Sequence, residues 1–422
     1  MKKLSTMLGL VVVSVVAAVA AGYSGSGESA TKAAEPMSAA AHAGMTHGGI
    51  THGTMVAAGG VQSPALDLRV QLDSLLGEHA LLAVRATQLG YSGSKAFPAL
   101  AKELDRNSVA ISKLIGSAYG PAAARKFLNG KFLWRDHIRF FVQYTQALAK
   151  KDVPGQKQAV ANLMRYVDVQ AAFFASATGL PKQALANGLT AHILQLKGAL
   201  DAYSKGRYAQ SQTLAHAAYD HMWMTGDQLA GAIAKQKSLS TAGASSKAAN
   251  LRVTLDRLLG EHALLAIFAT QSGISGGNDF AAVAAALDRS SVALSQAIAS
   301  VYGKPAAKKF LDGAFLWRDH IRFFVQYTQA LAKNDTVGQK KAVANLMRYV
   351  AAQAAFFATA TAVPKQALVN DLTAHVLQLK GQLDAYHGGR YAQSFTLTDA
   401  AYDHMMMTGA TLAGGIAKQK KL

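Results

Sequence analysis

Apolar residues recur three and four positions apart over most of the chain beyond residue 60, and Gly and Pro residues separate the runs. This spacing puts apolar side chains on one face of an α-helix, and no alternation typical of strands accompanies it. Pro98, Pro121, Pro154 and Pro181 stand near predicted starts, where a missing amide hydrogen does little harm. In the first half the pattern predicts helices near 66–89, 97–118, 122–150, 155–177, 182–204 and 208–235.

The pattern occurs twice. Each half is large enough for its own core, and short connections favour antiparallel neighbours. We therefore expect an all-α protein with two tandem homologous antiparallel helical bundles of about six helices each, at 64–236 and 247–420. The polar segment 237–246 has the composition of a linker. His79, His137, His192 and His221 recur as His262, His320, His375 and His404 with one constant shift (262 − 79 = 183).

The duplication compares the chain with itself and shows which histidines both copies retain. His216 corresponds to Asp399, and His387 corresponds to Ser204, so a fifth histidine in each copy is not matched. The four matched histidines lie on apolar helix faces near the middle of their helices, and we expect all of them to be buried. Converging buried imidazoles need a partner, so the sequence predicts a four-histidine metal site in each repeat. The alternative is that these histidines form hydrogen bonds within the core.

Sulfur and carboxylate groups accompany these histidines. Met224 and Met407 follow His221 and His404 by three positions, on nearly the same face, and are further candidate ligands. The neighbouring Met222 and Met405 are expected to fill the core. An acidic residue directly precedes three histidines of each copy, and we expect these acids to support ligands on adjacent helices: Glu78, Asp136, Asp220, Glu261, Asp319 and Asp403.

The amino terminus predicts export. Residues 1–22 have the layout of a signal peptide, with Lys2 and Lys3 before an apolar run that is short for a membrane span. Retention as an anchor is the alternative. Tyr23 stands where a lipoprotein would have its lipidated Cys, so lipidation is not expected. Residues 23–63 predict a disordered tether. Its soft and borderline donors are candidates for metal capture: Met37, His42, Met45, His47, His52 and Met55.

The donor set narrows the choice of ion. The chain has no Cys, which excludes disulfides and thiolate ligands. Imidazole together with thioether sulfur points first to copper, with haem b or zinc as alternatives. The net charge of +19, from 43 basic and 24 acidic residues, suggests contact with an anionic cell-wall or membrane surface. Because the basic residues are scattered and no nucleic-acid motif accompanies them, specific nucleic-acid binding is not expected.

The sequence carries no recognised catalytic motif. It lacks the Glu-x-x-His pairs of di-iron bundles, the zinc protease helix, the nucleophile elbow and the phosphate loop. A hydrolase that uses the Asp-His and Glu-His neighbours remains an alternative. The leading prediction is a metal-binding protein for sequestration or resistance, and the other is a structural or cell-surface module. Ligation by ordinary histidines predicts metal affinity that falls below about pH 6 to 6.5.

Four segments also resemble a known group of proteins. AYDHMWMTGDQLAGAIAKQ and AYDHMMMTGATLAGGIAKQ, with LGEHALL and FLWRDHIRFFVQYTQALAK, are similar to segments of poorly characterised exported helical-repeat proteins of Bacillus-like bacteria. The resemblance covers both repeats and implies export and a helical fold. Some members are labelled by association with copper amine oxidase N-terminal-type domains, which implies no oxidase activity for the helical part.

Overall fold

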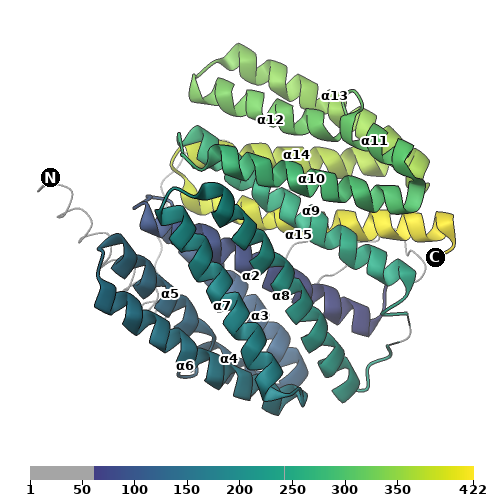
Figure 1. Ribbon diagram of the computed structural model, residues 1–422. Helices are drawn as coiled ribbons and strands as arrows, with labels where there is room; N and C mark the ends of the chain where they lie inside the picture. The colour runs from purple at the N-terminus through teal and green to yellow at the C-terminus, as the bar shows by residue number, and fades with distance from the viewer. Residues whose placement is uncertain (1–60, 242) are drawn as a thin grey trace, which may run out of the picture.

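The computed structural model describes residues 61–241 and 243–422 and is all-helical over them (Figure 1). The expected signal peptide and nearly all of the expected tether lie outside these residues. None of the described helices is long and apolar enough to span a bilayer. The helices of the first half are α2 (Pro64–Tyr91), α3 (Phe97–Tyr119), α4 (Pro121–Asn129), α5 (Trp134–Ala149), α6 (Val153–Thr178), α7 (Lys182–Ser204) and α8 (Tyr208–Gln236).

The second half repeats these helices, and every helix begins 183 positions after its counterpart (for α9, 247 − 64 = 183). Their order along the chain is the same as in the first half. The helices are α9 (Lys247–Ile274), α10 (Phe280–Tyr302), α11 (Lys304–Asp312), α12 (Trp317–Ala332), α13 (Thr336–Thr361), α14 (Lys365–His387) and α15 (Tyr391–Lys420).

One predicted helix, 122–150, is wrong: two helices, α4 and α5, take its place. The chain turns between them because Phe132 adopts a left-handed backbone conformation with φ 55°. Asp136 holds the turn, since its carboxylate accepts a hydrogen bond from the Phe132 amide at 2.7 Å. The second half has the same break, with Phe315 at φ 55° and Asp319 as the acceptor at 2.8 Å.

Helix α2 lies at the centre of the first half, in contact with α3, α5, α7 and α8, and α9 has the equivalent place in the second half. The two central helices also contact each other. One continuous hydrophobic core includes residues of both halves, among them Leu76 of α2 and Leu259 of α9. The two halves therefore share a buried seam.

Contacts across this seam come in matched pairs. The Arg69 guanidinium donates to the Ala244 carbonyl at 3.2 Å, and Arg252, its counterpart, donates to the Val61 carbonyl at 2.8 Å. Positions 61 and 244 are themselves counterparts, so each half offers the same groups to the other. Such reciprocal contacts are the mark of an isologous, two-fold-like interface.

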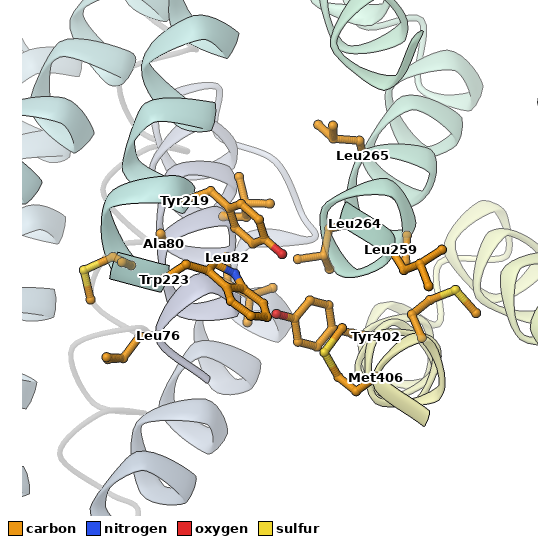
Figure 2. Close-up of a cluster of buried hydrophobic side chains, with 14 of the residues drawn as sticks. Leu76, Ala80, Leu82, Tyr219, Trp223, Leu259, Leu264, Leu265, Tyr402 and Met406 are labelled. Atoms are coloured by element: carbon orange, nitrogen blue, oxygen red, sulfur yellow. The ribbon is translucent and has the colours of Figure 1, made fainter. Parts of the chain in front are cut away.

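Tyrosines extend the same relation into the core of the seam, where Figure 2 shows Tyr219 and Tyr402 side by side with Trp223 and Met406. The Tyr219 hydroxyl donates to the Arg257 carbonyl at 2.7 Å, and the Tyr402 hydroxyl donates to the Ser74 carbonyl at 2.8 Å.

Close helix packing explains the glycines that both halves retain near the histidines. A Cβ atom added to Gly226 of α8 would lie 2.8 Å from the Asp73 Cα atom of α2, which is too close for any real contact. Gly77 of α2 lies directly against the Trp223 side chain in the same way. The glycines therefore permit the approach of α2 and α8.

Candidate metal centre

The four matched histidines of the first half come from α2, α5, α7 and α8 and form a row. The Nε2 atoms of His79 and His137 are 3.2 Å apart. The ring of His192 lies next, with its centroid 6.3 Å from that of His79. His221 follows, close enough to lower the pKa of His192. His79 and His137 are the inner pair of this row, and the partly exposed His221 is its outer histidine. His192 lies close to all three, since it also lowers the pKa of His137.

The second half builds the same row. The Nε2 atoms of His262 and His320 are also 3.2 Å apart. The rings of His375 and His404 stack with their centroids 6.2 Å apart. His375 also lowers the pKa of His262, which links the inner pair to the outer pair.

At least three histidines of each row are buried, and several of their nitrogens have no hydrogen-bond partner among the described residues. His79 is 0% exposed and His192 is 2% exposed. Neither ring nitrogen of His192 has a hydrogen-bond partner, and the Nδ1 atoms of His262 and His375 also lack one. A buried polar group without a hydrogen bond costs about 1–3 kcal/mol. Each half therefore holds a group of imidazole nitrogens that an additional ligand would stabilise.

The tautomer of His137 suits it to bind such a ligand. Its Nδ1–H donates to the Trp134 carbonyl one turn earlier in α5. The lone pair therefore lies on Nε2, the atom that faces His79. Tyr166 stacks on the other side of the His137 ring, with centroids 4.6 Å apart, and fixes its orientation.

Burial also keeps the inner histidines neutral. It lowers the pKa of His137 to about 3 and that of His320 to about 4. Burial is likewise the largest cause of the lowered pKa values of His79, His192, His262 and His375. Metal ions bind the neutral form of imidazole, so protons compete at the inner pair well below the range expected for ordinary histidines.

The histidines do not form a closed tetrahedral site as they lie. Within residues 61–241 and 243–422, the ligand atoms of no three histidines are all within 4.8 Å of one another. The acids Glu78, Glu103 and Asp399 are gathered that closely, but Arg106 forms ion pairs with Glu103 and Asp399. The histidine nitrogens that lie close together in each half are therefore the Nε2 atoms of the inner pair.

The outer histidines differ between the halves. His221 is partly exposed, contrary to the prediction that all four are buried, and its Nε2–H donates to the Gly188 carbonyl at 2.9 Å. His404 is 6% exposed. Asp371 replaces Gly188 there, and its carboxylate lies 3.2 Å from His404 Nε2. Thr408 holds the same carboxylate at 3.0 Å.

The methionines near the last histidine of each half are of two kinds, buried and exposed. Met222 and Met405 are each 2% exposed and fill the core, which confirms the prediction for them. Met224 is 56% exposed and Met407 is 39% exposed. Their sulfur atoms therefore belong to the surface beside the outer histidines, away from the inner pairs.

The acids that precede the histidines have other partners in the described residues. Asp136 and Asp319 close the turns before α5 and α12. Asp220 pairs with Arg257 across the seam. Glu78 accepts from Asn107 at 2.8 Å, and burial with the nearby Asp399 raises the pKa of the Glu78 carboxyl. Asp403 also has an interaction partner.

The unmatched His216 contributes to the seam, a role that the sequence comparison did not predict. Its Nδ1–H donates to the Glu261 carboxylate at 2.6 Å, which joins α8 to α9. At the equivalent place Asp399 pairs with Arg106 at 2.5 Å. His216 and its counterpart Asp399 therefore form different charge pairs across the seam.

Two buried glutamines also escaped the sequence analysis. Gln170 of α6 and its counterpart Gln353 of α13 are each 0% exposed. Both amide atoms of each side chain lack a partner among the described residues. Their identity in the two halves (353 − 170 = 183) was a usable signal, because an unpaired buried amide is costly and was nevertheless kept twice.

Comparisons with known proteins found no matching family model, no matching curated protein and no matching solved structure. The candidate site therefore stands on its own geometry. The six tail residues expected to capture metal lie outside the described residues.

Proposed function

We propose that the chain is an exported protein that binds a transition metal, copper above all, with one site in each of two tandem homologous antiparallel bundles. The bundles are 64–236 and 247–420, joined by the linker 237–246. The observation that carries this proposal is the row of buried, neutral imidazoles with unpartnered nitrogens, which is present in both halves. Its role would be sequestration of the ion or resistance to it.

The inner pair has the separation that two ligands of one ion require. Nitrogens bound at about 2.0 Å to a tetrahedral ion lie about 3.3 Å apart. The Nε2 atoms of His79 and His137 are 3.2 Å apart, and those of His262 and His320 have the same separation. His192 and His375 supply the third imidazole after a rotation of the side chain.

The outer parts of each row fit a route for the ion. His221 and Met224 lie at the surface end of the first row, and His404 and Met407 lie at that of the second. Thioether and imidazole together favour copper. The tail, with its own methionines and histidines, would collect ions for these sites once the chain is exported.

A structural role is the second candidate, because His79 and His137 lie at hydrogen-bond distance from each other.

Haem fits this pair less well. Two axial nitrogens on opposite sides of an iron are about 4 Å apart with bonds of about 2 Å each. The observed 3.2 Å leaves no place for the iron between them.

Elemental analysis of the purified chain tests the proposal. We expect the chain to take up two copper ions in addition to those held by the tail. A variant with all six tail ligands replaced by Ala measures these two ions alone. Replacing His79 and His137 by Ala should remove one ion, and replacing His262 and His320 should remove the other. His387→Ala is the control, since His387 is exposed and unmatched. Unchanged uptake after replacement of all four of these histidines by Ala would refute the proposal.

A further inference from the structure

A cavity of about 430 Å³ opens into the second half between α9, α10 and α12. This volume is in the range of small-molecule sites, about 300–1,000 Å³. The walls are mostly apolar and include Ala266, Ala269, Phe280, Ile321, Phe324 and Leu379.

The two ends of the cavity differ in chemistry. His320, of the inner histidine pair, contributes to its wall. Gln329 and Lys333 line it from the exposed end of α12. Among these described lining residues Lys333 is the one with a permanent charge, and none is a carboxylate.

The duplication indicates how the cavity arises. Ser272 lines it, whereas the counterpart in the first half is Leu89 (272 − 183 = 89), a core residue 5% exposed. The Ser272 hydroxyl is turned to Asp279, with the two oxygens 2.5 Å apart. Asp279 in turn forms an ion pair at 2.8 Å with Arg85 of α2. A small polar side chain therefore stands where the first half has a leucine that helps to fill the core.

We propose that this cavity is a binding site for a small amphipathic monocarboxylate, such as a medium-chain fatty acid. The apolar tail would occupy the space between α9, α10 and α12, where it is removed from water. The carboxylate would remain at the mouth, where Lys333 and Gln329 can donate hydrogen bonds to it. This site adjoins the proposed metal site of the second half, because His320 lines both, but the contacts made by its apolar walls and by Lys333 do not require a bound metal.

Calorimetric titration of the full chain with octanoate, octanol and octylamine tests the choice of ligand. We expect one octanoate per chain, weaker binding of octanol and the weakest binding of octylamine. Lys333→Ala should weaken octanoate binding about two- to fivefold, the usual effect of an exposed ion pair. It should leave octanol unchanged. Equal affinity for octanoate and octylamine would overturn the assignment of the carboxylate end.

Exchange of the counterpart residues tests the location. Ser272→Leu should fill the cavity and weaken octanoate binding at least tenfold, and Ala284→Leu on the α10 wall should do the same without touching Asp279. Leu89→Ser should open the twin position and raise the stoichiometry from one octanoate to two. Octanoate binding that is absent in the wild type, or unaffected by both filling variants, would contradict the proposal.

Discussion

At the residue scale, the same four histidines have different surroundings along each row. The inner pair is buried and neutral, while the outer histidine meets Gly188 in one half and Asp371 in the other. A Cβ atom at Gly188 would lie 3.7 Å from His221 Nε2, an ordinary contact distance, so an aspartate fits there. Gly188 and Asp371 can therefore be exchanged, so that each half supplies the substitution to be made in the other.

Exchange of these residues should change access to the outer histidines. Asp371→Gly should raise the rate at which diethyl pyrocarbonate acylates His404 severalfold, because the covering carboxylate is lost. Gly188→Asp should slow the acylation of His221. Mass spectrometry of each histidine gives the rates, with the exposed His387 as the internal control. Equal rates for His221 and His404 in the wild type would contradict the difference in cover.

Protonation of the inner histidines should lower stability in acid. Burial lowers the pKa of His137 to about 3 in the folded chain, whereas an unfolded histidine titrates near 6.5. Above about pH 6.5 both states are neutral. Between about 6.5 and 3 only the unfolded state gains a proton, so the free energy of unfolding falls by about 1.4 kcal/mol per pH unit.

Urea unfolding of metal-free protein at several pH values measures this effect. Asp256 acts in the opposite direction, since burial raises its pKa to about 7. The useful quantity is therefore the difference between the wild type and His137→Gln. The variant should show a smaller pH slope between about 6 and 4, by about 1 kcal/mol per unit. Identical slopes would mean that His137 is not held neutral.

At the element scale, hydrophobic periodicity predicted most helices within a few residues, because each buries one continuous apolar face. It failed at the turn between α4 and α5. The apolar spacing continues through Phe127, Leu128, Phe132 and Leu133, so a single helix satisfied the pattern. The turn depends on the φ of Phe132 and on the Asp136 carboxylate, which periodicity does not describe.

The packing of α2 on α8 makes a prediction at this scale. Gly226→Ala should destabilise the protein by about 1–3 kcal/mol, because its Cβ would press on the Asp73 backbone. Gly231→Ala, in the same helix, should stabilise it by about 0.5–1 kcal/mol, because no atom lies within 4 Å of the added Cβ. The shift of the urea midpoint measures both. Equal effects of the two substitutions would contradict the close approach of the helices.

At the scale of the whole molecule, the duplication produces two sets of matched histidines and a seam between the halves. The sequence revealed the histidines but not the seam. The matched histidines could be found by comparing the halves, because each has an identical residue 183 positions away. Hydrophobic periodicity predicted their inward faces, which is wrong for the partly exposed His221. The seam could not be found in this way. Even its matched contacts, Arg69 with Ala244 and Arg252 with Val61, join residues that a comparison of the halves does not pair. Other contacts use residues that the other half does not retain, such as His216 at one place and Arg85 with Asp279 at another. Only the folded chain brings them together.

The buried Arg85–Asp279 pair tests the seam. Asp279→Ala alone should destabilise the protein by about 3–5 kcal/mol, because it leaves Arg85 buried without its partner. The counterparts of these residues are Phe268 and Ala96. The double variant Arg85→Phe with Asp279→Ala should therefore recover much of the loss. Thermal unfolding measures this, and a single variant as stable as the wild type would show that the two halves do not rely on the pair.

We propose that the inner histidines of each half hold a metal ion. Anomalous diffraction at the copper edge, from crystals of the copper-loaded full chain, tests it most directly. We predict two peaks inside the helical halves, one at about 2.0 Å from the Nε2 atoms of His79 and His137 and one equally close to those of His262 and His320. Copper peaks confined to other parts of the chain, with both inner pairs empty, would show that these histidines do not bind copper.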